Sequence, residues 1–278
     1  MREGPGFRWF RRGVLTFLTL ITVVPLYVVV SSSVKPLADV QGRFSWIPRE
    51  VTLSPYVDTW TTVPLARYLV NSLIVAAVSA SLALLVAVAA AYALSRFTFR
   101  GDRAFRLAVL STQMVPGMLF LVPLFLIFSQ VHTWLGIRVI GTHAGLIVTF
   151  MTFSLPFAIW MLTGLFAGIP REVEEAALLD GLGRIGVLLR IVLPLARPAL
   201  AAVGIFAFVI AWGEVLFASV LSDADTRTLA VGLRAYITQS TVLWNELMAA
   251  SVIASVPVVV GFLMLHRHLM RGLGAGLR

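Results

Sequence analysis

The chain has few charged residues and no cysteine. Charged residues make up 13% of its 278 positions, about half the share of an ordinary soluble domain. Without cysteine there is no disulfide framework, no thiolate metal ligand and no thiol nucleophile. The GxxxxGK[ST] pattern of P-loops is also missing, so the chain cannot cradle a nucleotide by that route. These absences argue against a soluble thiol enzyme and against a P-loop ATPase.

Apolar residues dominate the sequence instead. They account for 59% of the chain, and the mean hydropathy is +0.93. A helix needs about 20 mostly apolar residues to cross a hydrocarbon core about 30 Å thick. Six such stretches predict an all-α polytopic membrane protein, a single transmembrane domain over residues 1–278. The six predicted spans are about residues 14–34, 69–94, 105–130, 144–166, 199–221 and 247–265.

The basic residues are distributed unevenly between the loops that these spans define. Six spans place both termini and the second and fourth loops on one side of the membrane. Fifteen of the 22 Lys and Arg residues fall on that side and seven on the other, whereas the acids outside the spans divide six to six. By the positive-inside rule, both termini are expected in the cytoplasm. Topology therefore explains the net charge of +9, and no nucleic-acid partner is needed.

Acidic residues are concentrated between the fourth and fifth predicted spans, in residues 168–198, here called the acidic loop. Its segment EVEEAALLDGLGRIGVLLRIVLPLARP holds three glutamates and an aspartate. We predict one short helix that starts at Pro170, a break at Gly181 and Gly183, and a second helix from about Arg184 until Pro194 ends it. Amphipathic helices on a membrane surface usually carry Lys and Arg on their polar face. The acids therefore favour a docked protein partner over a lipid surface.

Residue spacing predicts two faces of the acidic loop. A predicted apolar stripe consists of Leu178, Leu182, Ile185 and Leu189. A neighbouring face of small or charged side chains consists of Ala177, Gly181 and Arg184. Because the stripe has helical periodicity, we expect it to attach the loop to the membrane helices and leave the second face for a partner.

Seven positions of the acidic loop resemble the EAA signature of permease subunits of binding-protein-dependent ABC importers. They are Glu175, Ala176, Ala177, Gly181, Ile191, Leu193 and Pro194. The segments NSLIVA, AAYALSRFTFRG and RHLMRGL are similar to the members of that family that import sugars and sugar-like solutes. The pattern resembles the six-helix, maltose-transporter G-subunit type, and the resemblance covers nearly the whole chain.

The resemblance implies a type I ABC importer permease fold and a non-enzymatic role in sugar import by alternating access. In the family, the EAA loop occupies a groove of a cytoplasmic ATPase, where its glutamate pairs with an arginine. Glu175 matches that glutamate, and Gly181 is expected to permit the break that shapes the loop. The full set of expected ATPase-coupling residues is Glu175, Ala176, Ala177, Asp180, Gly181, Ile191, Leu193 and Pro194.

The resemblance also implies partners and a location. We expect a second permease subunit, two cytoplasmic ATPase subunits and an extracytoplasmic solute-binding protein, in a prokaryotic plasma membrane. No cofactor or metal is expected on this chain, because ATP and Mg would bind to the ATPase. The sugar and the lipid bilayer are the remaining expected partners.

Glu214, in the segment AWGEVLFAS, is the only acid within a predicted span, where a charge costs about 2.5 to 3.5 kcal/mol at mid-membrane. One interpretation places Glu214 and Trp212 beside the sugar pathway, because a carboxylate accepts hydroxyl hydrogen bonds and an indole stacks on a pyranose. Another makes Glu214 a structural partner of the second permease. An alternative function is a stand-alone ion-coupled transporter with Glu214 as its ion site. This alternative gives the acidic loop no role, and the sequence shows no internal repeat of the kind found in many such transporters.

Overall fold

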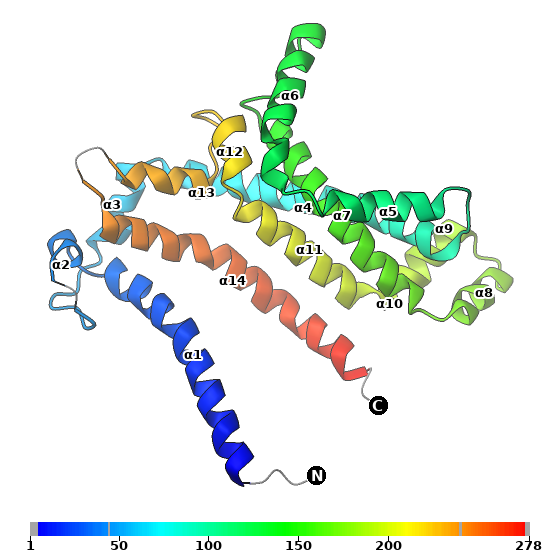
Figure 1. The fold of residues 1–278 in the computed structure, drawn as a ribbon, viewed down its shortest axis with the longest axis horizontal. Helices are drawn as coiled ribbons and strands as arrows, with labels where there is room; N and C mark the ends of the chain where they lie inside the picture. The colour runs from blue at the N-terminus through cyan, green and yellow to red at the C-terminus, as the bar shows by residue number, and fades with distance from the viewer. Residues whose placement is uncertain (1–4, 44, 239–240, 276–278) are drawn as a thin grey trace. The chain divides into compact units, whose positions relative to one another are not determined.

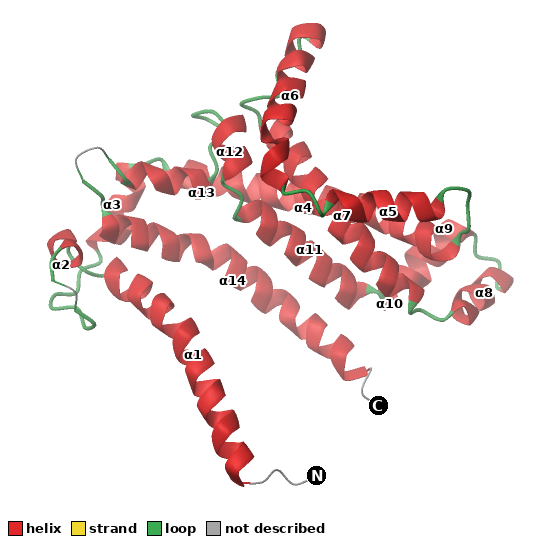
Figure 2. Cartoon of the chain, in the orientation of Figure 1, coloured by secondary structure: helices red, strands yellow, loops and turns green. Residues whose placement is uncertain are grey.

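The protein is helical throughout most of the residues described by the computed structural model, 5–43, 45–238 and 241–275 (Figures 1 and 2). Within those ranges β pairing is limited to one isolated antiparallel bridge, between Ile237 and Val242. This confirms the predicted all-α class. The chain separates into two compact units, Met1–Ala66 with Gly232–Val256 and Arg67–Val231 with Pro257–Arg278, which are described in turn.

The first unit is held together by hydrogen bonds between short helices. Its elements are α1 (Pro5–Ser33), α2 (Leu37–Gln41), α3 (Ser54–Thr62), a 3-10 turn at Leu233–Tyr236 and the start of α14 (Trp244–Ala275). The hydroxyl groups of Thr59 and Tyr236 hydrogen-bond to each other. The Gln41 side chain donates to the carbonyl of Val242 at 3.0 Å. These contacts join α2 and α3 to the segment that leads into α14.

The second unit holds most of α4 and the helices that follow it. Its elements are α4 (Leu65–Arg96), α5 (Asp102–Thr112), a 3-10 turn (Gly117–Phe120), α6 (Leu121–Leu135), α7 (His143–Ala167), α8 (Arg171–Leu179), α9 (Arg184–Val187), a π-helical turn (Leu188–Val192), α10 (Leu193–Leu195), α11 (Arg197–Trp212), α12 (Leu216–Leu221) and the start of α13 (Leu229–Gly232).

Several helices have the length and composition of membrane spans. Among the described residues, five single helices qualify: Gly6–Ser33, Leu65–Arg96, Gly117–Leu135, His143–Ala167 and Trp244–Met264. A sixth candidate is a pair of helices, Arg184–Leu195 and Arg197–Trp212, bent by 80°. With this pair counted as one span, the number equals the six predicted.

The predicted span over residues 105–130 differs from the structure, which divides this stretch into α5 and α6. α5 has 11 residues, a length of about 16 Å that is too short to cross a bilayer. Pro116 lies in the break with φ −54° and ψ 122°. It has no N–H to donate, and it disfavours helical geometry in the residue before it. The candidate span therefore starts at Gly117, and α6 leaves α5 at a steep angle (Figure 1).

The predicted span over residues 199–221 is also interrupted. α11 ends at Trp212 and α12 starts at Leu216, so residues 213–215 lie outside both helices. Gly213 weakens a helix because its backbone loses more entropy on folding than that of other residues. α12 turns away from the axis of α11 (Figure 1).

Small residues on α4 form the centre of the second unit. A stripe of buried alanines recurs every three or four residues at Ala76, Ala80, Ala83, Ala87 and Ala91. Small side chains let neighbouring membrane helices approach closely. Phe150, Leu162 and Phe166 of α7 fill the space around the stripe and are almost fully buried. α4 is therefore enclosed along one face over most of its length.

Candidate functional site

The first helix of the acidic loop, α8, begins directly after Pro170. Pro170 has φ −56° and ψ 135° and precedes the helix by one residue, whereas the sequence predicted a start at Pro170 itself. Glu172 and Glu174 lie in the first turn of α8. Unpaired N–H groups at a helix N-terminus favour negative charge. These two glutamates are therefore placed where the helix itself stabilises them.

Gly181 ends α8 in the left-handed conformation, with φ +89°. Its N–H donates to the carbonyl of Leu178 at 3.1 Å, and the N–H of Leu182 donates to the carbonyl of Ala177 at 3.1 Å. This pair of bonds is the Schellman motif, which satisfies carbonyls at a helix C-terminus. A Cβ added at Gly181 would meet no atom within 4 Å. The position therefore favours glycine because of its backbone angle and not because of crowding.

The second helical stretch continues beyond its predicted end. We expected Pro194 to end it, but α9, the π-helical turn and α10 run on to Leu195. The N–H of Leu193 donates to the carbonyl of Leu188, five residues back. A proline in a regular helix clashes with the carbonyl four residues earlier, and π turns are a local departure from that spacing. The π-helical turn directly before Pro194 therefore coincides with the point where a regular helix would clash.

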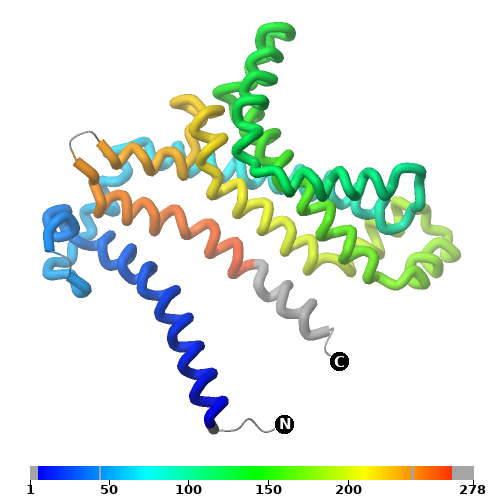
Figure 3. Tube along the Cα trace, in the orientation of Figure 1, coloured from blue at the N-terminus to red at the C-terminus, as the bar shows by residue number. Residues whose placement is uncertain are grey.

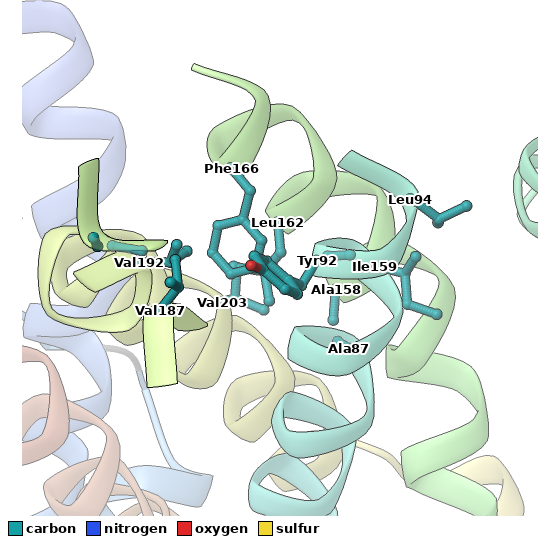
Figure 4. Close-up of a cluster of buried hydrophobic side chains, with 13 residues drawn as sticks. Ala87, Tyr92, Leu94, Ala158, Ile159, Leu162, Phe166, Val187, Val192 and Val203 are labelled. Carbon is teal, nitrogen blue, oxygen red and sulfur yellow. The ribbon is translucent and has the colours of Figure 1, made fainter. Parts of the chain in front are cut away.

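The acidic loop is attached to α4, α7 and α11 through an apolar cluster. Ala177 of α8, Val187 of α9 and Val192 of the π-helical turn are buried against it. In Figure 4, Tyr92 of α4 and Phe166 of α7 meet at its centre. The burial of these apolar side chains away from water stabilises the contact. The loop is thus a packed part of the second unit, and the trace shows it beside the end of α4 (Figure 3, right).

A buried ion pair reinforces this attachment. Nε of Arg96, the last residue of α4, lies 2.6 Å from Oε1 of Glu174. Their side chains are only 5% and 6% exposed. A buried charge is tolerated when it is paired and its remaining hydrogen-bonding groups are satisfied. The pair therefore needs further partners.

Those partners come from α4 and from the end of α7. The Tyr92 hydroxyl donates to Oε2 of Glu174 at 3.3 Å. The Arg96 guanidinium also donates to the carbonyls of Phe166 at 2.8 Å and Ile169 at 3.0 Å. These two carbonyls lie at and just beyond the C-terminal end of α7. One side chain, Arg96, thus joins α4, α7 and α8.

The outward face of the acidic loop is a mixture of acidic, small and large apolar side chains. Glu175 and Ala176 are exposed, Leu179 is 90% exposed and Ile185 is 74% exposed. The guanidinium of Arg184 lies 5.4 Å from the ring of Phe97, in the segment after α4. This distance is typical of a cation–π contact.

The predicted division into two faces was wrong in part. Leu178 and Leu182 pack against the apolar cluster as expected, but Ile185 and Leu189 are exposed. Ala177, assigned to the outward face, is buried. The stripe applied one helical periodicity across the break that was itself predicted, and the turn at Gly181 changes the direction of the chain.

The eight predicted coupling residues therefore fall into two groups. The exposed group is Glu175, Ala176, Asp180 and Gly181. The buried or half-buried group is Ala177, Ile191, Leu193 and Pro194. Ile191 and Leu193 pack against the cluster that contains Val203 of α11. The first group is available to a partner, and the second connects the loop to α11.

Comparison with known proteins decides the family. Residues 79–274 match the family described as the binding-protein-dependent transport system inner membrane component. The chain belongs to this family. The inner membrane ABC transporter permease protein YcjP of Escherichia coli strain K12 is 38% identical to it over 271 residues, covering 96% of this chain and 94% of YcjP.

A second relative and a solved structure agree. The maltose/maltodextrin transport system permease protein MalG of Vibrio parahaemolyticus is 34% identical over 277 residues, covering 94% of this chain and 91% of MalG. A chain of a bacterial ABC transporter involved in the import of the acidic polysaccharide alginate has the same fold, with a TM-score of 0.80 at 22% identity. That match covers 96% of this chain and 99% of the other. The protein is thus a multi-pass inner-membrane permease, and its relatives are transport proteins.

Glu214 of this permease forms hydrogen bonds with its own backbone. Its Oε1 accepts from the N–H groups of Leu216 at 2.9 Å and Phe217 at 3.2 Å, and its Oε2 accepts from Ala218 at 3.0 Å. The carboxylate thereby satisfies N–H groups at the start of α12 that have no partner within the helix. Trp212 stacks on Phe208 with ring centroids 5.5 Å apart. A role for Glu214 and Trp212 along the sugar pathway stays a prediction.

The residues that sequence reasoning missed are Arg96 and Glu174. One signal in the sequence pointed to Arg96, which ends a long apolar stretch. Glu174 lies three residues before Ala177, on the same side of a helix, but Ala177 was itself assigned to the outward face, so this spacing did not indicate burial. The pairing could not be predicted, because 77 residues lie between Arg96 and Glu174 and only the folded chain brings them together. Within the described ranges, no group of three or more His, Cys, Asp or Glu residues could hold a metal.

Proposed function

We propose that this permease imports sugars or sugar-like solutes as one half of an ATP-driven transporter, and that the acidic loop is where the ATPase docks. The substrate class follows from similarity to MalG, a maltose/maltodextrin permease, and to a transporter of alginate. Both act on carbohydrates. Which sugar this chain carries depends also on its partner proteins.

The observation that carries the docking proposal is the contrast between the two sides of the acidic loop. Its inner side is fixed to three long helices by the apolar cluster and by the Arg96–Glu174 pair. Its outer side presents Glu175 together with exposed Leu179. Large apolar side chains exposed on a charged element mark a surface that binds another protein. A carboxylate in that surface suits an arginine of the partner.

The mechanism follows from this arrangement. Closure of two ATPase subunits around ATP and Mg would draw their docked acidic loops together. Because the loop is packed against α4, α7 and α11, its displacement moves those helices instead of being absorbed locally. The bundle then changes from inward-open to outward-open, which is a rigid-body switch between two packed states. This chain binds no ATP itself.

The proposed assembly has one orientation in the membrane. The acidic loop and both termini face the cytoplasm, as the distribution of basic residues predicts. A second permease subunit pairs with this chain, and two ATPases bind on the cytoplasmic side. A solute-binding protein, from which the family takes its name, delivers the sugar to the opposite face.

A charge reversal at Glu175 tests the docking. In the complex produced with its permease, ATPase and binding-protein partners, we expect Glu175→Lys to leave membrane insertion intact but abolish ATPase co-purification or sugar-stimulated ATP hydrolysis. Glu172→Lys reverses another exposed acid of α8 that is not among the expected coupling residues, and it is the matched control for net charge. Normal uptake by the Glu175→Lys transporter would refute the proposal.

The stand-alone ion-coupled transporter is not favoured. It requires Glu214 as a free ion site, and both of its oxygens accept backbone hydrogen bonds. Uptake that persists without the ATPase subunits, yet collapses when an ionophore is added, would restore this alternative.

A further inference from the structure

α4 is an unusually uniform helix. It runs for 32 residues from Leu65 to Arg96 and contains neither proline nor glycine. The other three helices of 25 residues or more in the described chain all contain an internal proline, at Pro25, Pro156 and Pro257. Proline removes a backbone hydrogen bond and kinks a helix. α4 therefore lacks the feature that would let it bend.

Both ends of α4 are fixed by side chains of the helix itself. At its C-terminal end, Arg96 holds Glu174 of the acidic loop, as described above. Near its N-terminal end, the Asn71 amide donates to the carbonyls of Asp225 at 2.8 Å and Arg227 at 3.0 Å. The side-chain oxygen of Asn71 lies 2.8 Å from Nε2 of His143 on α7. Asn71 thus satisfies its hydrogen-bonding groups in one buried position.

Ser72 adds a second contact, to the first residue of α13, directly after the loop. Its hydroxyl accepts from the N–H of Leu229 at 2.7 Å, and both residues are buried. The loop between α12 and α13, residues 222–228, is therefore attached to α4 on either side of Arg227. We call these contacts of Asn71 and Ser72 the loop clamp.

The loop held by the clamp has its own internal order. Oδ1 of Asp223 accepts from the N–H groups of Asp225 and Thr226, each at 3.0 Å. Oδ2 of Asp223 lies 2.8 Å from a guanidinium nitrogen of Arg138, and Arg67 lies 2.7 Å from Asp225. The hydrogen bonds of Asp223 order the loop internally, while Arg67 attaches it to α4 and Arg138 attaches it to the segment before α7.

We propose that α4 is a rigid rod that transmits displacement of the acidic loop to residues 222–228, with Arg96 and Asn71 as the positioning residues at its two ends. Arg96 follows Asn71 by 25 positions, a rise of about 37 Å at 1.5 Å per residue, which exceeds a hydrocarbon core of about 30 Å. ATPase closure on one side of the membrane thereby changes the position of residues 222–228 on the other side. The inference rests on the proposed docking of the ATPase.

The absence of cysteine makes a direct measurement possible. An Ala224→Cys variant puts the chain's only thiol on an exposed residue of the loop. The full transporter, with cysteine-free partner subunits, is placed in lipid nanodiscs so that both faces are accessible. The rate of thiol modification is measured with and without a non-hydrolysable ATP analogue and Mg²⁺. We expect the analogue to change that rate by about fivefold or more, the lower range of allosteric couplings.

Four further substitutions in the Ala224→Cys background test which contacts of α4 carry the response to the ATP analogue. Glu174→Gln and Asn71→Ala should remove most of the response to the ATP analogue while the ATPase subunits still co-purify. Glu172→Gln, in the same turn of α8, and Ser81→Ala, exposed on α4, are the matched controls and should keep the response. An unchanged response in Glu174→Gln or in Asn71→Ala would overturn the proposal.

A double variant separates transmission from independent structural damage. Distant sites that act independently have additive free-energy effects. Suppose that each single substitution lowers sugar uptake per ATP hydrolysed by about fivefold. If the two effects are independent, the double variant Glu174→Gln with Asn71→Ala should lower this ratio by about 25-fold. If both residues act through one rod, the double variant should lower the ratio by only about fivefold, because either substitution alone already interrupts transmission along α4. A multiplicative loss would overturn the rod.

The outcomes also distinguish this inference from the proposed function. If the ATPase does not co-purify with the Ala224→Cys parent, the docking proposal fails and the rod fails with it. If the ATPase co-purifies and drives uptake but the thiol does not respond to the ATP analogue, docking stands and the rod is refuted.

Discussion

Glu174 and Glu175 are consecutive residues of α8 that lie in opposite environments. Glu174 is 5% exposed and pairs with Arg96 at 2.6 Å, whereas Glu175 is exposed. Successive residues on a helix are about 100° apart, because 3.6 residues complete a turn. One acid therefore attaches the acidic loop to α4 and its neighbour remains available to a partner.

Removing the buried acid should cost much stability. Glu174→Ala leaves the Arg96 guanidinium buried without its counter-charge, and breaking such a pair costs about 3 to 5 kcal/mol. We expect a lower thermal unfolding midpoint for the purified transporter in detergent. Glu172→Ala, an exposed acid in the same turn, should change stability by no more than about 0.5 kcal/mol. Equal effects of the two substitutions would contradict the buried pairing.

The turn at Gly181 gives a second matched comparison. Gly181→Ala places a side chain on a residue with φ +89°, which costs about 1 to 2 kcal/mol for an L-residue. Gly183 has φ −75° and no atom within 4 Å of an added Cβ. Gly183→Ala carries no such backbone penalty and should lower the unfolding midpoint less than Gly181→Ala does. Unfolding midpoints of the two variants, measured side by side, test whether backbone angle decides.

Glu214 should matter for stability more than for transport chemistry. Glu214→Ala removes the acceptor for three N–H groups at the start of α12, and loss of such a cap costs about 0.5 to 2 kcal/mol. Glu214→Gln keeps one acceptor oxygen and should lie between Ala and the native residue. ATP-driven uptake into proteoliposomes should persist with Gln. Complete loss of uptake in a stably folded Glu214→Gln transporter would point back to a direct role for the carboxylate.

The loop held by α4 should be acid-sensitive through Asp223. Hydrogen bonds donated by Thr226 lower the pKa of this carboxyl below its ordinary value of 3.8. A group whose pKa is lower in the folded state stabilises the fold when ionised. Its contribution is therefore present above about pH 4 and is lost as the pH falls through the folded-state pKa. Asp223→Asn should abolish this part of the pH dependence of thermal unfolding, while native protein and variant converge at lower pH.

The family could be predicted from the sequence because its signature is local. The positions from Glu175 to Pro194 are defined by spacing along the chain, and the six apolar stretches are defined by composition over about 20 residues. The turn at Gly181 was also predictable, since glycine readily adopts the left-handed conformation that ends many helices.

Other features depended on backbone details that average composition does not show. The span predicted over residues 105–130 was placed by its apolar content, but Pro116 divides it. The helix predicted to end at Pro194 continues to Leu195, and a π-helical turn directly precedes the proline. Pro116 interrupts its helix whereas Pro194 does not, so the effect of each proline depended on the backbone around it.

The sequence by itself determined that this chain is a membrane-embedded permease with an acidic element between its fourth and fifth predicted spans, because hydropathy and motif spacing are properties of neighbouring residues. Only the tertiary structure decided that Arg96 holds Glu174, that Asn71 holds the loop before α13, and that Ala177 faces inward. Those contacts join residues 78 or more positions apart, or depend on how a turn redirects the chain. Their geometry exists only after the helices have packed.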